Sequence, residues 1–559
     1  MNIKKCIAEK INFDKVNLNL EDLIIESISA DKGDYSLPCF SFAKELRENP
    51  NKIANDICQS VTLGGIVEKC EVIGGYVNFF LNKNEVSKLV INELATEDFN
   101  LANNGKTICI DYSSVNLAKY MHIGHLKNTI IGESLARLSE SMGYKVVRIN
   151  YIGDYGTPFG KIIAAYELWG NKQDVDERGI DALQDLYVKF NQEAENNETL
   201  NDKAREIFKL VELKDEHYYA VYKWIIEIAI KEAERLLNIL GVKFDSWRGE
   251  AYYSEKLNDV VDFLTSKGLT KISEGALVVD LADFDMPPCL IRRSDGASLY
   301  ATRDIAAAID RYENYKFDKM FYVTGHEQML HFKQFFKVLE LAGKEFATNL
   351  EHIHYGLFSL PTGKISSRKG KQATLVDLMT YAQNKANEVI ADRTFNVLTP
   401  EEVSSKVARS ALNFNALKVE VGKDCVFDID KAFSFDGETA PYMQYSYTRI
   451  ESILRKAKQL NLDVEADYSA LNTLEAFELI KACNTVKDTI SLAFNKREPS
   501  IIVKKAMDIC KTLNKFYTNT KVLDGANEQI KAKIELLISV KKVLAKLFNL
   551  MCIDTLEEM

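Results

Sequence analysis

Two histidines that flank a glycine stand where an extended apolar stretch meets a helical pattern. The tetrapeptide is His122-Ile123-Gly124-His125, which follows the extended stretch Thr107–Asp111 and precedes apolar residues at helical spacing from Leu126 to Met142. Imidazole rings can donate hydrogen bonds to phosphate oxygens, and the free amides of a helix N-terminus attract the same anions. Gly124 would let the backbone pack closely beneath a nucleotide. This cluster predicts a triphosphate site at a strand-to-helix turn.

A second polar and basic segment lies far downstream. It reads Gly363-Lys364-Ile365-Ser366-Ser367-Arg368-Lys369-Gly370 and precedes a helical pattern that begins near Leu375. Two or three cations on a loop can hold a departing pyrophosphate. Alone, the segment is better explained as an exposed turn. Paired with the histidine cluster, it predicts an enzyme that holds ATP from two sides and promotes attack on the α-phosphorus by positioning and charge stabilisation.

These residues need a scaffold that brings distant loops together. Strand and helix patterns alternate between residues 106 and 395, which favours a parallel sheet with crossover helices. Ligands bind such sheets beyond the carboxyl ends of the strands, where the histidine cluster stands. A long acidic helical stretch around 169–247 is expected to be an insertion. The expected strands are Thr107–Asp111, Lys145–Asn150, Ala276–Leu281 and Lys319–Thr324.

The flanking regions differ from this core. Residues 1–105 mix helices, such as Phe40–Leu46 and Asn51–Cys58, with an alternating strand at Gly75–Leu81, which predicts an α+β domain ending at the Asn103–Gly105 turn. We expect a connector over residues 396–435 and an all-helical domain over 436–559. Its amphipathic runs are Met443–Lys458, Leu474–Phe494, Ser500–Tyr517 and Ile530–Phe548.

Bulk composition narrows the class of protein. The 559 residues contain no apolar run long enough for a membrane span and no N-terminal signal pattern, so we expect a cytoplasmic protein. The ten cysteines are scattered without a Cys-x-x-Cys pair, and we expect reduced thiols. The pair His352-x-His354 is a weak metal-site candidate, and we expect no dedicated metal site. The net charge is −10, yet Tyr468–Ile553 carries 14 Lys and Arg against 8 Asp and Glu, which suits a polyanion or simply a solvated helix face.

Longer segments carry a specific resemblance. The stretches from Asp111 to Gly132, from Asn150 to Gly160 and from Leu299 to Ala308 resemble arginyl-tRNA synthetases, a family of class I aminoacyl-tRNA synthetases. The segment Asp34–Lys44 is similar to that family's additional N-terminal domain, and Thr439–Arg449 to the entry of its anticodon-binding domain. The resemblance implies a multidomain protein: an α+β N-terminal domain, an α/β Rossmann-like parallel-sheet catalytic core and an all-α C-terminal domain.

The resemblance also implies a reaction and its partners. Arginine and ATP would form arginyl-adenylate, and the arginyl group would pass to the terminal adenosine of tRNA-Arg, first to its 2′-OH. Bound tRNA would be needed for activation, Mg²⁺ would accompany ATP, and the protein would be a monomer. A guanidinium suits carboxylates in fork geometry. By the resemblance, Asp111 and Asp304 would face the guanidinium, although without it Asp304 is better explained as a helix N-terminal carboxylate.

The remaining roles come from the same resemblance. Tyr300 would line the arginine pocket, Asn116 and Gln328 would hold the α-amino and carboxylate end, and Lys119 would lie near the α-phosphate. The residues implied to bind ATP are His122, Gly124, His125, Lys364 and Ser366. Those implied to act in catalysis are Lys119, His122, His125, Lys364, Arg368 and Lys369. Tyr517 and Met559 would contact tRNA, with core packing an equal alternative for Tyr517.

Departures from the family pattern leave alternatives open. Ser367 stands where a second lysine is usual, Tyr155 where tryptophan is frequent and Pro158 where glutamine is frequent. The altered loop motivates a catalytically decayed tRNA-binding homologue as the alternative, against which Lys119 and both histidines count. A synthetase for another amino acid would leave the carboxylate pair unpaired.

Overall fold

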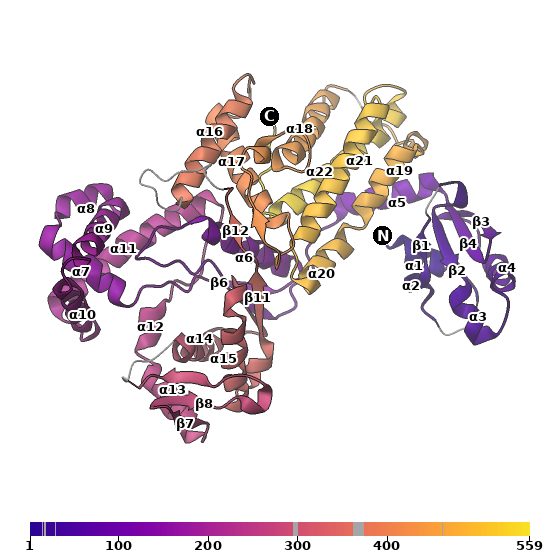
Figure 1. Cartoon of the computed structure of the whole chain (residues 1–559). Helices are drawn as coiled ribbons and strands as arrows, with labels where there is room; N and C mark the ends of the chain where they lie inside the picture. The colour runs from indigo at the N-terminus through magenta and orange to yellow at the C-terminus, as the bar shows by residue number, and fades with distance from the viewer. Residues whose placement is uncertain (14, 16–17, 28–29, 295–299, 362–373, 461) are drawn as a thin grey trace.

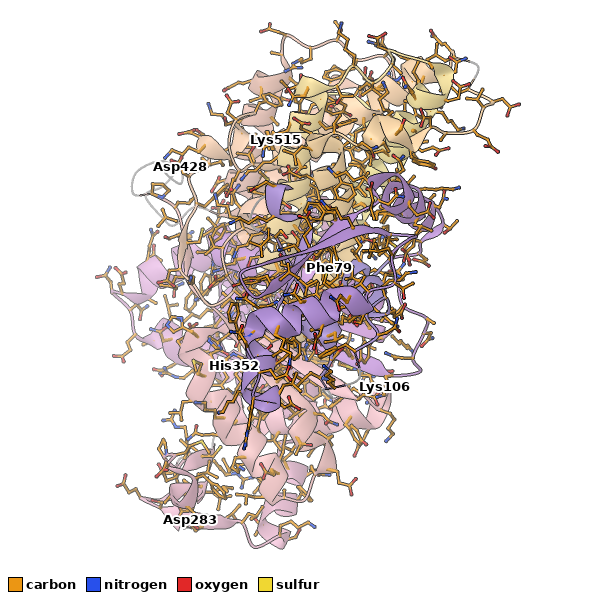
Figure 2. All side chains as sticks on the ribbon, turned by 90° about the vertical axis from the view of Figure 1, so that its right-hand side faces the viewer. Phe79, Lys106, Asp283, His352, Asp428 and Lys515 are labelled. Atoms are coloured by element: carbon orange, nitrogen blue, oxygen red, sulfur yellow. A yellow bond between two sulfur atoms is a disulfide. The ribbon has the colours of Figure 1, made fainter. Side chains whose placement is uncertain are left out.

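The computed structural model describes the whole chain except residues 14, 16–17, 28–29, 295–299, 362–373 and 461. A central parallel sheet lies between a helical bundle on one side and an N-terminal domain on the other, with a small antiparallel sheet below and a larger helical domain above (Figure 1). A view turned by 90° has Lys515 of the helical domain toward one end and Asp283 at the other, with Phe79 of the N-terminal domain between them (Figure 2).

The central sheet supplies the edge at which the predicted site residues meet. Its strand order is β11-β10-β5-β6, and every neighbouring pair is parallel. Three of its strands match the predicted ones, whereas β11, which carries a glutamate and two histidines, is not among them. The strands are β5 (Thr107–Asp111), β6 (Lys145–Ile149), β10 (Lys319–Gly325) and β11 (Leu350–Tyr355). The core helices are α6 (Ile123–Ser141), α14 (Tyr300–Tyr315) and α15 (Met329–Leu341).

One predicted strand belongs to a different sheet. The apolar run that starts at Ala276 forms β8, the middle strand of an antiparallel sheet in the order β7-β8-β9. The expectation that it joins the parallel sheet is wrong, because its partners are hairpin neighbours rather than crossover-connected strands. The elements of this region are α12 (Glu250–Ser254), α13 (Leu257–Ser266), β7 (Thr270–Ser273), β8 (Ala276–Val279) and β9 (Cys289–Arg292).

The predicted helical insertion is present as a bundle. Its first helix packs against three later ones, so the bundle begins at Thr157, upstream of the predicted start near 169. Its helices are α7 (Thr157–Trp169), α8 (Lys172–Arg178), α9 (Ile180–Ala194), α10 (Thr199–Glu212) and α11 (Glu216–Ile239).

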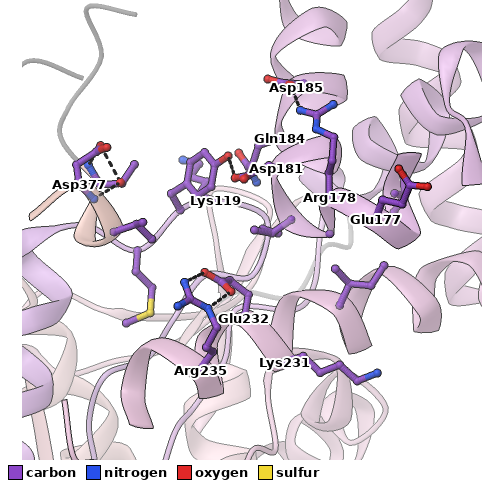
Figure 3. Close-up of a pocket in the computed structure, with 18 of the residues that line it drawn as sticks. Lys119, Glu177, Arg178, Asp181, Gln184, Asp185, Lys231, Glu232, Arg235 and Asp377 are labelled. Carbon is purple, nitrogen blue, oxygen red and sulfur yellow. Dashed lines mark hydrogen bonds and ion pairs between the residues drawn. The ribbon is translucent and has the colours of Figure 1, made fainter. Parts of the chain in front are cut away.

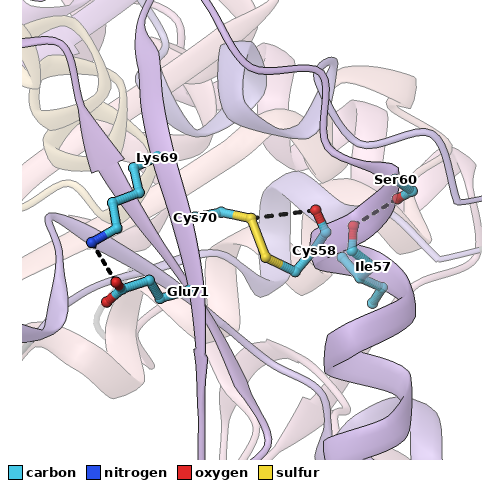
Figure 4. Close-up of a disulfide and its surroundings, with 6 residues drawn as sticks. All are labelled: Ile57, Cys58, Ser60, Lys69, Cys70 and Glu71. Carbon is cyan, nitrogen blue, oxygen red and sulfur yellow. Dashed lines mark hydrogen bonds and ion pairs between the residues drawn. A yellow bond between two sulfur atoms is a disulfide. The ribbon is translucent and has the colours of Figure 1, made fainter.

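The N-terminal region is an α+β domain around an antiparallel sheet in the order β1-β2-β4-β3. Cys58, near the end of α4, forms a disulfide with Cys70 of β3 (Figure 4). The expectation of ten reduced thiols is wrong for this pair, because α4 packs on β3 and joins cysteines that their spacing does not link. Its elements are α1 (Ile3–Ala8), α2 (Leu20–Leu23), β1 (Ile25–Glu26), β2 (Tyr35–Pro38), α3 (Phe40–Leu46), α4 (Pro50–Ser60), β3 (Val67–Ile73), β4 (Tyr76–Leu81) and α5 (Lys83–Thr96).

The C-terminal third is almost entirely helical, as the sequence predicts. The expected helix Leu474–Phe494 is interrupted at Thr485 and forms two helices. Within the described residues, no helix has the length and apolarity that a membrane crossing requires. The elements are β12 (Phe358–Ser359), α16 (Leu375–Ile390), α17 (Pro400–Leu417), β13 (Cys425–Val426), α18 (Ala440–Ala457), α19 (Leu474–Asn484), α20 (Val486–Lys496), α21 (Ser500–Asn519) and α22 (Asn527–Leu550).

Candidate active site

The two histidines of the first signature cap the N-terminus of α6. Nδ1 of His122 accepts a hydrogen bond from the Gly124 amide at 3.1 Å, and Nδ1 of His125 accepts one from the His122 amide at 3.0 Å. Each ring therefore uses one nitrogen as an acceptor for an otherwise unpaired helix amide. In a neutral imidazole the other nitrogen, Nε2, must then carry the proton. The cap fixes both rings as Nε2–H donors.

Burial keeps these rings uncharged. It lowers the pKa of His125 to about 3, and the neighbouring His122 ring adds to the effect. Burial and the charge of Lys119 also lower the pKa of His122. A Cβ atom on residue 124 would lie 2.9 Å from Cε1 of His122, so Gly124 gives that ring its room. The pair can donate to phosphate oxygens without bringing fixed positive charge.

The second signature lies outside the described residues, so Lys364, Ser366, Arg368 and Lys369 have no described positions. The structure describes the chain again from Thr374 onward. Thr374 forms an isolated antiparallel bridge with His122, and the Leu375 amide donates to the Met121 carbonyl at 2.7 Å. The first described residues beyond that gap, Thr374 and Leu375, are thus held beside the first signature.

The predicted carboxylates come together but already have partners. Asp111, buried at the end of β5, forms an ion pair with Arg311 of α14, with Oδ2 and Nη1 2.8 Å apart. Asp304, on the same helix, accepts a hydrogen bond from Nε2 of His331 at 2.5 Å. Burial raises the pKa of Asp111, Arg311 opposes the rise, and the charge of Asp304 adds to it. The two carboxylates therefore share one electrostatic environment.

A third carboxylate, which sequence reasoning missed, belongs to this cluster. Glu250, the first residue of α12, lies 3.4 Å from Nη1 of Arg303. Burial raises its pKa to about 7, with further contributions from the charges of Asp154 and Asp304. A buried carboxylate with such a pKa is a candidate functional group. The residues around it, Trp247-Arg-Gly-Glu250, do not by themselves predict the raised pKa, because that pKa depends on elements distant in the chain.

The other predicted pocket residues lie at the same edge of the sheet. Asn116 pairs with Gly153 through an isolated parallel bridge, and its side-chain oxygen accepts from the Ala118 amide at 3.0 Å. Gln328 ends the 3₁₀ turn that follows β10 and is exposed. Tyr300 begins α14 with 68% of its surface exposed. These three side chains are accessible to a ligand, unlike Asp111.

A cavity of about 1370 Å³ opens beside the first signature. Lys119 and His122 form part of its wall, facing helices α8, α9 and α11 of the bundle and the start of α16 (Figure 3). Several of its charged side chains pair with one another, as Glu232 does with Arg235 and Arg178 with Asp185. The predicted phosphate-binding residues thus border a space large enough for more than a nucleotide.

The predicted tRNA contacts lie at a run of arginine and aromatic side chains in the helical domain. The Arg449 guanidinium lies 5.2 Å from the Tyr517 ring and 5.7 Å from the Tyr445 ring. Arg393 lies 5.9 Å from the Tyr445 ring and donates to the carbonyl of Met559 at 3.5 Å. Tyr517 is mostly buried, and its hydroxyl has no hydrogen-bond partner among the described residues. Packing and binding roles for Tyr517 are therefore compatible.

Three models of known protein families match successive parts of the chain. Residues 85–429 match a family model described as tRNA synthetases class I (R), catalytic domain. Residues 443–559 match the DALR anticodon binding domain, and residues 1–81 match the arginyl tRNA synthetase N terminal domain.

Curated relatives and solved structures match over the full length. Arginine–tRNA ligases of Clostridium perfringens and Clostridium beijerinckii are 41% and 42% identical to the chain, with complete coverage of both proteins in each case. The arginyl-tRNA synthetase of Thermus thermophilus has the same fold, with a TM-score of 0.82 at 22% identity, covering 100% of this chain and 99% of the other. That of Plasmodium falciparum gives 0.78 at 24% identity, covering 100% and 97%.

Proposed function

The chain belongs to the arginyl-tRNA synthetases, and on that premise we propose how its residues divide the work of an arginine–tRNA ligase. In the first step, a carboxylate oxygen of arginine attacks the α-phosphorus of ATP and pyrophosphate leaves, which gives arginyl-adenylate. In the second, a ribose hydroxyl of the terminal adenosine, the 2′-OH in our proposal, attacks the arginyl carbonyl and AMP leaves. The ATP site and the arginine site adjoin at the carboxyl ends of β5 and β10.

On the nucleotide side, we assign donors to His122, His125 and Lys119. Their support is the helix cap that leaves both Nε2–H groups available, together with the position of Lys119 on the same cavity wall. Gly124 gives the ATP its close approach. From the second signature, Lys364, Ser366, Arg368 and Lys369 are assigned to the opposite side of the triphosphate. Mg²⁺ is proposed to arrive with the phosphates, which suits an ion that keeps waters and phosphate oxygens as ligands.

On the arginine side, we assign two carboxylates, Asp304 and Glu250, to the guanidinium of the substrate. The support is electrostatic: Asp304 already raises the pKa of Glu250, so a cation placed between them would relieve repulsion and favour the charged carboxylate. Asp111 remains near the pocket, but the Arg311 side chain already neutralises its charge. Asp111 therefore contributes mainly by holding Arg311 in place. Tyr300 lines the pocket, and Asn116 and Gln328 hold the α-amino and carboxylate end.

For tRNA, we propose contacts from three parts of a monomer. The domain limits proposed from the sequence are residues 1–105, 106–395, 396–435 and 436–559. The acceptor end would enter the cavity beside Lys119, and the anticodon would meet the arginine and aromatic run that reaches Tyr517 and Met559. Unstacked bases bind such planar groups by stacking and cation–π contact. Activation is proposed to require bound tRNA.

The observation that carries the arginine assignment is the charge of Asp304, which adds to burial in raising the pKa of Glu250. We would measure ATP–pyrophosphate exchange with each amino acid, with and without tRNA. Exchange with arginine alone, and only with tRNA present, is the expected result. Exchange with another amino acid would overturn the pocket assignment. Salt-sensitive tRNA binding without any exchange would favour the decayed homologue instead.

A further inference from the structure

Helix α9 of the bundle holds the loop that carries Lys119, a contact that the proposed mechanism does not use. Gln184 of α9 is 6% exposed, and its Nε2 donates to the Ala118 carbonyl at 2.8 Å. One turn earlier, Asp181 accepts from the Tyr120 hydroxyl at 2.7 Å. Figure 3 shows Lys119, Asp181 and Gln184 close together on the wall of the cavity. Positions three apart share one face of a helix, so one face of α9 reaches the residues on both sides of Lys119.

Backbone hydrogen bonds hold the chain before and after this loop. Before it, the Leu117 amide donates to the Gly153 carbonyl at 3.1 Å. After it, the Met121 carbonyl accepts from the Leu375 amide at 2.7 Å. The three residues between these anchors are the ones that the side chains of α9 meet. The position of Lys119 therefore depends on the bundle as well as on the ends of the loop.

The side chain of Lys119 is exposed, so the backbone of its loop sets the region that its ammonium can reach. A buried amide that donates to a buried carbonyl is ordinary packing chemistry. The Gln184 amide differs in its target, because that carbonyl belongs to the residue before an assigned phosphate donor. A displacement of about 1 Å at a reacting centre can lower its rate about 100-fold. A contact that fixes this loop therefore matters for the chemistry.

We propose that Gln184 is a positioning residue for adenylation, which together with Asp181 fixes the loop of residues 118–120 and thereby directs Lys119 toward the α-phosphate. The inference rests on the proposed function, in which Lys119 donates to that phosphate. Loss of the Gln184 donor lowers kcat for exchange and leaves arginine binding intact, because the carboxylates assigned to the guanidinium lie on α12 and α14.

Gln444 of α18 provides a matched control in the helical domain. It is fully buried, and its Nε2 also donates to a backbone carbonyl of a distant segment, that of Asp554, at 3.0 Å. Gln184→Met and Gln444→Met each replace the amide with an unbranched side chain that donates no hydrogen bond. A loss of stability alone should affect both variants in the same way, whereas a positioning effect belongs to Gln184.

The experiment compares both variants with the wild-type full-length protein in ATP–pyrophosphate exchange at saturating tRNA, below their thermal midpoints. Gln184→Met is expected to lower kcat about 10-fold with KM for arginine within about twofold, and Gln444→Met to leave kcat within about twofold. Tyr120→Phe, which loses only the bond to Asp181, should lower kcat about three- to fivefold. In a Lys119→Ala background, Gln184→Met should lower kcat by less than about twofold more, because its effect acts through that lysine.

An unchanged kcat in folded Gln184→Met would overturn the inference. An equal loss in Gln444→Met, or an undiminished further loss in the Lys119→Ala background, would do the same, because either result indicates a general structural effect. If Gln184→Met does not fold, Tyr120→Phe decides: a kcat at least about twofold below wild type supports the inference, and wild-type turnover refutes it.

The proposed function is tested separately, by exchange with arginine in the wild type and in Lys119→Ala alone. Normal exchange in Lys119→Ala would overturn the assigned role of that lysine, and this inference with it. A loss in Lys119→Ala combined with a normal kcat in Gln184→Met would overturn the inference and leave the proposed function standing.

Discussion

Glu250, which we assign to the arginine pocket, has a carboxyl whose charge changes near neutral pH. Its pKa of about 7 means that the free protein holds the carboxyl partly protonated at pH 7. A guanidinium binds the charged form, so kcat/KM for arginine should rise as pH increases through 7. Glu250→Gln should lower kcat/KM about 100-fold and remove this rise, since a hydrogen bond to a charged group is lost. The measurement is kcat/KM for arginine from pH 6 to 8.5.

The same pKa predicts that the stability of the free protein falls as pH rises, whereas kcat/KM rises. The folded protein holds the Glu250 proton more tightly than the unfolded chain does, for which the ordinary value is 4.5. Without arginine, the free energy of unfolding should therefore contain a contribution that is lost as pH rises from about 4.5 to 7.

A wild-type pH profile of kcat/KM that matches that of Glu250→Gln would contradict the assignment of Glu250 to the arginine pocket.

His125 combines two roles that one substitution can separate. Its Nδ1 accepts from the His122 amide, and its Nε2–H makes no hydrogen bond to any of the described residues. In His125→Asn, the side-chain oxygen can replace Nδ1 as acceptor, but no donor reaches the Nε2 position. We expect the thermal midpoint to change by less than about 2 °C while exchange falls about 100- to 1000-fold, as for loss of one transition-state donor. A large loss of stability with unchanged turnover would show a capping role only.

Acid should weaken the wild-type protein through the same ring. The pKa of His125 is about 3 in the folded protein against an ordinary 6.5. As pH falls below 6.5 the unfolded chain takes up the proton first, so the free energy of unfolding decreases between pH 6.5 and about 3. In His125→Asn this part of the acid sensitivity should disappear, which urea unfolding at several pH values would measure.

At the scale of elements, the disulfide is a feature that can be tested without reference to catalysis. Cys58 and Cys70 join α4 to β3 across 12 residues. Reducing a disulfide that closes a loop of this length lowers the free energy of unfolding by about 2–4 kcal/mol. We expect dithiothreitol to shift urea unfolding of the N-terminal domain and to leave exchange with arginine nearly unchanged. The double variant Cys58→Ser, Cys70→Ser should not respond to dithiothreitol, and alkylation of ten thiols in the untreated protein would contradict the bond.

The elements also show what the sequence could predict. The apolar runs of β5, β6 and β10 identify buried parallel strands, and the histidine signature identifies the N-terminus of α6. The run at Ala276 is just as apolar, but its pairing depends on hairpin partners that periodicity does not reveal. The interruption at Thr485 contains neither glycine nor proline, so the helical pattern continues across it.

The site residues also divide into those that a local sequence pattern predicts and those that depend on distant segments. His122 and His125 belong to one local motif, and their mutual hydrogen bond needs only the turn between them. The pairing of Asp111 with Arg311 and the raised pKa of Glu250 depend on packing between segments that lie far apart in the chain. Local residue patterns predict the first kind of feature, and only the folded structure reveals the second.

At the scale of the whole molecule, the helical domain supports both other parts. Its last helix, α22, packs against α5 and α6, and the Ser134 hydroxyl of α6 donates to the Leu550 carbonyl at 2.7 Å. Lys542 of α22 donates to the Ala95 carbonyl of α5 at 2.8 Å. Helices α5 and α6 are therefore both joined to the helical domain through one long helix, α22. A tRNA that contacts all three would bind to one connected body.

The arginine and aromatic run allows the proposed anticodon end of that contact to be tested by itself. The Arg449 guanidinium lies near both the Tyr445 and the Tyr517 rings, so Arg449→Met removes a positive charge and a planar group that bases could stack on, and keeps both rings. We expect Kd for full-length tRNA to increase about tenfold, since stacking on such groups contributes about 1–3 kcal/mol per base. Its salt dependence should also become shallower, because fewer counterions are released. An acceptor-stem minihelix, which lacks the anticodon, should bind the variant and the wild type equally. An equal loss of affinity for the minihelix would move Arg449 out of the anticodon contact, because only the acceptor arm is common to both RNAs.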